Sequence, residues 1–389
     1  MERAGPGGQT GNGNSVKESG MLKLRTVGVI FALVGAMALA ACGDDDNGSS
    51  DSGSSTGGDG GGSGSIALLL PESKTARYES QDRPNFERKA KELCADCEII
   101  YSNADQDAAK QQQQAEAAIT KGAKVLVLDP VDAASAGAIV NRAKQSQIPV
   151  ISYDRLITDA DIDYYISFDN EQVGKLQGES LVKKLTDDGA KGSIIMINGA
   201  PTDNNAKLFK EGAHSVIDTS DYKVAKEYDT PDWSPDKAQQ EMEQAITASG
   251  KDGFVGVYAA NDGTGGGAIA AMKGNGIDPK TRPTTGQDAE LAAIQRILID
   301  EQYMTVYKAI KAEAEAAAEL AVALAKGDTP PAADDKIDNG TKQVPSILLT
   351  PVAVTKDNIN DTIVKDKFWS VDEICTGKYA AGCKAAGIQ

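Results

Sequence analysis

Histidine, cysteine and aromatic residues are scarce in this sequence. Among 389 residues there are 1 histidine, His214, and 5 cysteines, and aromatic residues make up 5%. Histidine is the commonest general base and a common metal ligand, so metal chemistry would fall to carboxylates or cysteines. We therefore expect a protein that is not an enzyme and that needs no metal or cofactor.

Basic residues are also outnumbered. The chain has 40 Lys and Arg against 57 Asp and Glu, giving a formal net charge of -17. Phosphate backbones are bound by clustered Lys and Arg, and no such cluster is present. This composition excludes a nucleic-acid partner and indicates an acidic surface in contact with solvent.

Long hydrophobic runs are missing too, and the most apolar run is a 15-residue stretch from 27 to 41. A membrane span needs about 20 residues, so a transmembrane anchor is disfavoured. Lys23 and Arg25 precede the run, as in a secretion signal. The run ends in Leu-Ala-Ala-Cys42, which resembles the lipobox of bacterial lipoproteins. We expect a signal peptide over residues 1 to 41 and a lipid on Cys42, anchoring the exported protein to the outer face of the cytoplasmic membrane.

Two flanking segments carry little fold information. Met21 opens a complete signal peptide by itself, so one interpretation of residues 1 to 20 is a start-site artefact. Residues 42 to 65 follow the cleavage site and are mostly Gly, Ser and Asp. Such a composition does not bury enough apolar surface to order itself. It predicts a disordered tether.

From Ile66 onward, short apolar segments alternate with helical patterns. Expected strands are Ile66–Leu70, Glu98–Tyr101, Val125–Leu128, Val150–Tyr153, Tyr164–Phe168, Ser193–Ile197, Tyr222–Ala225, Phe254–Ala259, Thr284–Thr285, Tyr303–Lys308 and Ile347–Val354. Continuous apolar strands between helices are typical of parallel sheets covered on both faces. The chain is too long for one typical core, so two α/β domains are expected.

Polar side chains recur where the expected strands end. In open α/β sheets, ligands collect at the carboxyl ends of the strands. For any single Asp or Asn, a helix cap or a solvated loop is the commoner role, but recurrence after most strands favours a site. Carboxylates, amides and guanidinium groups bind neighbouring hydroxyls, and Tyr78 and Trp233 offer flat apolar faces to a sugar ring. The polar group comprises Arg77, Asp154, Arg155, Asp203, Asn204, Asn205, Asn261, Asp262, Gln287, Asp288 and Lys308.

Four cysteines remain after Cys42. They form two close pairs in the sequence, Cys94 with Cys97 and Cys375 with Cys383. Four cysteines allow three pairings, and local disulfides suit an exported protein. A zinc site or a redox motif is the rival interpretation, which the spacing and the lack of histidine disfavour.

Several segments together resemble the D-xylose-binding proteins of ABC sugar importers, members of the type I periplasmic-binding-protein superfamily. The resemblance covers about Ile66 to Phe368. Departures are Tyr78 where relatives often have Trp, an apparently extra residue near Gln81, and the cysteine-bearing tail. The segments that carry the resemblance are Tyr153–Arg155, Asp161–Glu171, Pro201–Leu208, Asn261–Asp262, Gly286–Asp288, Met304–Lys308 and Leu348–Pro351.

The resemblance implies two doubly wound parallel-sheet lobes joined by a three-strand hinge near Asp169, Lys308 and Thr350. The first lobe would be 66–168 plus 309–349, and the second 169–308 plus 350–389. A monomer would bind a monosaccharide, foremost D-xylose, between the lobes and deliver it to an ABC permease. The implied sugar contacts are Arg77, Tyr78, Asp154, Arg155, Asp203, Asn205, Trp233, Asn261, Asp288 and Lys308.

Three other functions compete with transport. A secreted glycosidase would use paired carboxylates such as Asp154 and Asp203 as acid and base. A sugar-responsive repressor of the same fold would need a DNA-binding segment before Ile66, where the lipobox and tether stand instead. A sugar-sensing subunit for a membrane receptor would share the binding site, and this alternative stays open.

Overall fold

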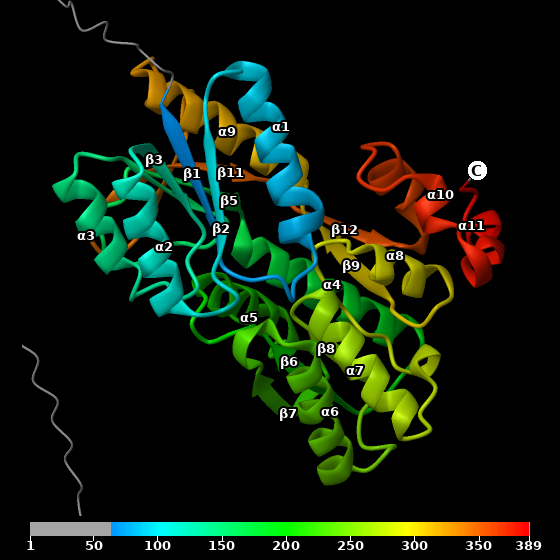
Figure 1. Ribbon diagram of the computed structural model, residues 1–389. Helices are drawn as coiled ribbons and strands as arrows, with labels where there is room; N and C mark the ends of the chain where they lie inside the picture. The colour runs from blue at the N-terminus through cyan, green and yellow to red at the C-terminus, as the bar shows by residue number, and fades with distance from the viewer. Residues whose placement is uncertain (1–63, 389) are drawn as a thin grey trace, which may run out of the picture. The chain divides into compact units, whose positions relative to one another are not determined.

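The computed structural model describes residues 64 to 388, and its larger sheet has seven strands in the order β10-β11-β5-β4-β3-β1-β2 (Figure 1). Neighbouring strands are parallel except β10 and β11. The central strands are apolar and buried because helices cover both faces of the sheet. The bounds are β1 Ser65–Leu70, β2 Ile99–Asn103, β3 Ala123–Leu128, β4 Val150–Tyr153, β5 Tyr164–Phe168, β10 Asp335–Asp338 and β11 Gln343–Leu349.

Four long helices cover this sheet. Helices α2 and α3 pack on one face through Ala118 and Val140, and α1 and α9 pack on the other through Phe86 and Ala317. We call this sheet and these four helices the first lobe. Their bounds are α1 Arg83–Leu93, α2 Ala108–Thr120, α3 Gly137–Gln145 and α9 Ile310–Lys326.

The second lobe combines a three-stranded parallel sheet, β7-β6-β8, with the antiparallel pair β12-β9. Helices α4 and α5 pack on one side of β6 through Val173 and Phe209, and α6 and α7 pack on the other through Met242 and Met272. The bounds are β6 Ser193–Asn198, β7 Lys223–Asp229, β8 Gly256–Ala259, β9 Met304–Tyr307, β12 Val352–Thr355, α4 Asn170–Asp187, α5 Asn204–Ile217, α6 Pro235–Ser249, α7 Asp262–Gly274 and α8 Leu291–Leu298.

Three elements differ from the sequence predictions. The expected strand Thr284–Thr285 is a single bridge to Val257, because the Thr285 hydroxyl accepts the Ala259 N–H at 2.8 Å. A continuing strand would have offered a backbone carbonyl there. Strand β10 was not predicted, because its Asp-Lys-Ile-Asp sequence is polar and lies at the sheet edge. The single strand expected over Ile347–Val354 is divided between β11 and β12.

Within the described residues the chain passes between the lobes three times. It leaves β5 for α4, returns from β9 to α9, and leaves β11 for β12. The segment after β12 includes α10 Val371–Ile374 and α11 Ala380–Ala385, which pack on α8 of the second lobe (Figure 1). The passage from β9 to α9 reaches the site described below through Lys308, and the passages after β5 and β11 are adjacent, since the Asp169 N–H donates to the Leu349 carbonyl at 3.2 Å.

The four cysteines are bonded in local pairs, Cys94 with Cys97 after α1 and Cys375 with Cys383 in the tail. Across residues 64 to 388, no helix is both long and apolar enough to cross a membrane. The expected signal peptide and the expected lipid site at Cys42 lie outside the described residues.

Candidate functional site

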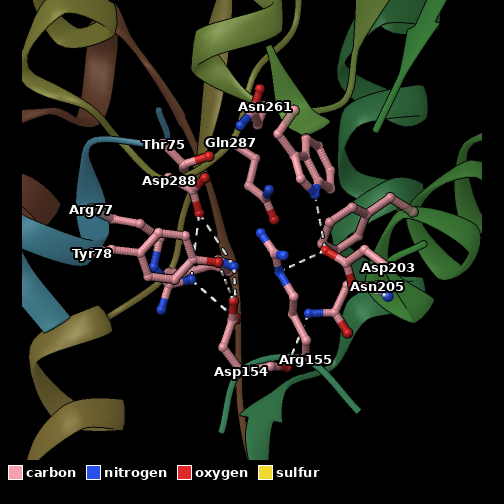
Figure 2. A pocket seen from close by; sticks show the side chains of 13 residues that line it. Thr75, Arg77, Tyr78, Asp154, Arg155, Asp203, Asn205, Asn261, Gln287 and Asp288 are labelled. Atoms are coloured by element: carbon pink, nitrogen blue, oxygen red, sulfur yellow. Dashed lines mark hydrogen bonds and ion pairs between the residues drawn. The ribbon is translucent and has the colours of Figure 1, made fainter. Parts of the chain in front are cut away.

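A cavity with an empty volume of about 250 Å³ lies between the two lobes, and Figure 2 shows its lining. All ten side chains that the resemblance implies as sugar contacts line it. Thr75, Phe209 and Gln287 line it as well. Gln287 belongs to the polar group at strand ends, whereas a lone Thr in a loop and a Phe inside a helix carry no sequence signal for a site.

The lining residues reach the cavity from loops at the ends of parallel strands. Arg77 follows β1, Asp154 follows β4, and Asp203 follows β6. Two of these side chains are also helix caps. Asp203 accepts the Asn205 N–H at 2.8 Å at the start of α5, and Asn261 accepts the Thr264 N–H at 2.8 Å at the start of α7. Helix capping and cavity lining therefore coincide, because these helix N-termini face the cavity.

Arg77 is held in place by carboxylates of the first lobe. Its guanidinium forms two hydrogen bonds to Asp82, at 2.6 and 2.9 Å, and one to Glu313 at 2.6 Å. It also donates to Asp154 at 3.1 Å. The side chain is buried, so these contacts fix the direction of the guanidinium without help from solvent.

Asp154 is a carboxylate surrounded by the positive charges of the cavity. Besides Arg77, the ammonium of Lys308 lies 3.4 Å from its carboxylate, and the Tyr78 hydroxyl donates to it at 3.2 Å. Burial alone would raise the pKa of Asp154, but the charges of Arg77, Lys308 and Arg155 outweigh burial and hold this pKa below its ordinary value. Asp154 is therefore a permanent carboxylate acceptor.

Asp288 and Gln287 present free acceptors to the cavity. Among residues 64 to 388, no donor forms a hydrogen bond with Asp288 Oδ1 or Gln287 Oε1, although both residues are buried. The ammonium of Lys308 lies 3.2 Å from Asp288 Oδ1 as an ion pair. Buried oxygens without a donor are costly, and a ligand hydroxyl in the cavity supplies a donor.

The wall of the cavity that contains Arg155, here called the Arg155 wall, combines an ion pair with two aromatic rings. Arg155 Nε lies 3.0 Å from Asp203, which also accepts the Trp233 indole N–H at 3.0 Å. Trp233 has a φ of 53°, and its ring packs edge-on against Phe209 with centroids 6.3 Å apart. A β-carbon added at Gly199 would overlap the Trp233 ring. A glycine is therefore required beneath the indole.

The Asp203 carboxylate is engaged by groups of the protein itself. It accepts N–H groups on both oxygens and faces Arg155. Residues 64 to 388 also contain no group of three or more His, Cys, Asp and Glu that could hold a metal. The arrangement is suited to binding a small polyhydroxylated molecule.

A family model described as a periplasmic binding protein domain matches residues 66 to 329. The D-xylose-binding periplasmic protein of Escherichia coli K12 is 42% identical over 313 residues, which cover 79% of this chain and 92% of that protein. The multiple sugar-binding periplasmic receptor ChvE of Rhizobium radiobacter is 34% identical over 80% of this chain and 92% of its own length.

Solved structures show the same similarity. A solute-binding protein of an ABC transporter from Clostridium phytofermentans, with bound β-D-glucose, superposes with a TM-score of 0.70 at 30% identity. The match covers 80% of this chain and 99% of that one. A carbohydrate transporter solute-binding protein from Chloroflexus aurantiacus, in complex with D-glucose, gives 0.71 at 30% identity over 79% of this chain and 97% of its own.

Proposed function

Because the chain belongs to the periplasmic binding protein family, whose members bind solutes and are not enzymes, we propose that it binds a monosaccharide, foremost D-xylose, and delivers it to an ABC permease. The observation that carries this proposal is the cavity itself. Charged and amide groups surround it, and within residues 64 to 388 no donor forms a hydrogen bond with Asp288 Oδ1 or Gln287 Oε1. Each hydroxyl of a pyranose both donates and accepts, which this mixture of groups requires.

The lining of the cavity supports binding of a sugar ring. The aromatic rings of Tyr78 and Trp233 line the cavity beside the polar groups, as binding the C–H faces of a sugar requires. D-Xylose is preferred because the E. coli relative at 42% identity is described as binding it.

We propose that binding closes the two lobes about the three passages of the chain near Asp169, Lys308 and Thr350. On this proposal, the first lobe comprises 66–168 plus 309–349 and the second comprises 169–308 plus 350–389. Sugar contacts from both lobes stabilise the closed form, and the permease recognises that form. The near-complete burial of Arg155 and Asp288 in this structure, at 2% and 3% exposure, is what a closed cleft produces.

We also propose that the chain is exported as a monomeric lipoprotein anchored through Cys42, on the basis of the lipobox-like Leu-Ala-Ala-Cys42. Changing Cys42 to Ala should leave the protein without lipid and release it from membranes. Mass spectrometry and membrane fractionation check this, and a variant that is still lipidated would contradict it.

A sugar-sensing role is the second candidate, supported by the similarity to a relative named as a receptor. It uses the same cavity but a different membrane partner. Genes for a permease and an ATPase next to this one would favour transport, whereas a neighbouring receptor gene would favour sensing.

A thermal-shift panel of monosaccharides on the purified chain tests binding. A ligand at 100 times its dissociation constant adds about 2.7 kcal/mol of stability. We expect D-xylose, or a close relative such as D-glucose, to raise the melting temperature, and D-mannitol to serve as an open-chain control. A panel in which no monosaccharide has an effect would contradict the proposal.

A further inference from the structure

Behind the Arg155 wall of the cavity lies a carboxylate that the proposed sugar contacts do not use. Asp129 directly follows β3 and is fully buried. Neither of its carboxylate oxygens accepts a hydrogen bond from residues 64 to 388. Its nearest positive charge is Arg155, whose Nε lies 3.6 Å from Asp129 Oδ1. Asp129 thus lies within ion-pair range of a cation but forms no hydrogen bond with it.

Arg155 is shared among carboxylates from both lobes. Asp203 of the second lobe is the nearest, with 3.0 Å between Arg155 Nε and Asp203 Oδ2. Asp129 and Glu72 of the first lobe lie farther away, at 3.6 and 3.7 Å. Three buried carboxylates therefore compete for one guanidinium, and their separation into two lobes makes the outcome depend on closure.

The three carboxylates differ in how well other groups compensate them. Asp203 accepts N–H groups from Asn205 and Trp233, and Glu72 accepts the backbone N–H groups of Lys74 and Thr75. No group of the described chain, residues 64 to 388, donates a hydrogen bond to the Asp129 carboxylate. When Arg155 turns to Asp203, Asp129 is the carboxylate with the least compensation for its charge.

We propose that Asp129 is a positioning residue, which holds the Arg155 guanidinium in the first lobe while the cleft is open and binds a proton when closure brings Arg155 to Asp203. The proposal rests on the sugar-driven closure proposed above. It predicts that sugar binding is coupled to proton uptake, and that Asp129 is the group that takes up the proton.

The pKa of Asp129 is shifted in the direction that this coupling needs. Burial raises the pKa of Asp129 well above its ordinary value, and Arg155 opposes the rise. Asp154 and Asp203 add to the rise, and Arg77 lowers it. The remaining titratable neighbours are Glu72, which shares Arg155, and the Tyr78 hydroxyl, which interacts with Asp129 electrostatically.

The direction of the pH dependence follows. If the closed form has the higher Asp129 pKa, it binds more protons than the open form between the two pKa values. Sugar affinity is then highest below the pKa that Asp129 has in the open form, and it falls as pH rises from that value to the higher pKa of the closed form. The fall is up to about tenfold per pH unit where one whole proton is taken up.

Titration calorimetry of the full chain with D-xylose tests the coupling. Measurements at several pH values, in phosphate and in Tris buffers of different ionisation enthalpy, count the protons taken up. We expect the wild type to take up more protons than Asp129→Asn, and the variant to have the flatter pH dependence. Asp129→Glu should restore part of the uptake. Asp132→Asn, in the same loop but partly exposed, should behave as the wild type.

Equal proton uptake in the wild type and Asp129→Asn would overturn the proposal. A wild type that takes up no proton would overturn it without any variant. If D-xylose does not bind, only the proposed sugar is contradicted. Small-angle scattering of the sugar-free chain then tests the role of Asp129. The wild type should become more compact as pH falls and Asp129→Asn should not, whereas the same response in both would refute the role of Asp129.

Discussion

Two buried charged groups, Arg77 in the first lobe and Asp262 in the second, are compensated in different ways. In the first lobe, Asp82, Asp154 and Glu313 surround the guanidinium of Arg77. In the second lobe, no Lys or Arg among residues 64 to 388 forms an ion pair with Asp262, which instead accepts from Gln302 at 2.7 Å, from Thr305 at 2.9 Å and from the Glu290 N–H at 2.9 Å. The charge of Arg77 is thus balanced by opposite charges, and that of Asp262 by neutral donors.

This difference separates two physical roles. A guanidinium surrounded by carboxylates is fixed in place, but it is costly to remove because the carboxylates are then left without compensation. Carboxylates held by neutral donors keep a raised pKa and respond to pH. Burial raises the pKa of Asp262 to about 7 and that of Glu290 to about 8. The Arg77 cluster therefore supplies a rigid wall, and Asp262 and Glu290 supply groups that titrate near neutral pH.

The largest expected effect comes from removing the central cation of the first lobe. Arg77→Met leaves Asp82 and Glu313 buried without their cation, which should lower the free energy of unfolding by about 3–5 kcal/mol. Arg83→Met is the matched control, because Arg83 also pairs with two carboxylates but is 39% exposed. Its loss should cost about 1 kcal/mol or less. Urea unfolding of both variants measures the difference, and equal losses would show that burial of the Arg77 cluster does not make its cation costly to remove.

A smaller effect is expected at the aromatic wall of the second lobe. Gly199→Ala places a methyl group where the Trp233 ring lies, so the indole must shift. Overpacking of this kind costs about 1–3 kcal/mol, and sugar affinity should fall by about tenfold. Gly274→Ala is the control, because a β-carbon there meets nothing within 4 Å. Calorimetry and Trp fluorescence check both variants, and unchanged affinity in Gly199→Ala would show that the position of Trp233 is unimportant.

The smallest effect is a pH dependence in the second lobe. Glu290 Oε1 lies 3.4 Å from the Ala76 N–H of the first lobe. Its folded pKa of about 8 is above its ordinary value of 4.5, so the folded chain binds more protons between these values. Stability is then full below about pH 4.5 and falls as pH rises toward 8, by more than about 1 kcal/mol.

Glu290→Gln should weaken this fall, and Glu211→Gln, whose parent side chain is 55% exposed, should not. Unfolding measured between pH 5 and pH 9 compares the three proteins. A variant with the same pH dependence as the wild type would contradict the assignment to Glu290.

The lining of the cavity was largely predictable because parallel sheets gather strand ends at one edge. Strands such as Ile66–Leu70 are recognisable in the sequence as apolar runs. The polar residue that follows such a run then lies at the edge where the strands end. Thr75 and Phe209 were missed because nothing in their local sequence separates a lining residue from a loop or core residue. The edge strand β10 was missed because it is polar.

The roles of buried carboxylates were not predictable. Asp129 and Asp203 each follow an apolar strand, and the sequence gives no sign that one accepts two N–H groups while the other accepts none. Hydrogen-bond satisfaction depends on backbone N–H directions and on residues far away in the chain. Trp233, 30 positions beyond Asp203, is an example.

The central claim is that charged groups from both lobes hold one sugar, and calorimetry of Arg155→Ala and Asp288→Ala tests it most directly. D-Xylose, D-glucose and D-ribose are titrated into the wild type and both variants. Hydrogen bonds to charged groups contribute about 1.5–3 kcal/mol, so each change should weaken binding by about ten- to a hundredfold or more. Asp288→Asn keeps the shape of the side chain and is the control that separates a loss of sugar binding from a loss of folding. Unchanged affinity in both alanine variants would contradict the claim.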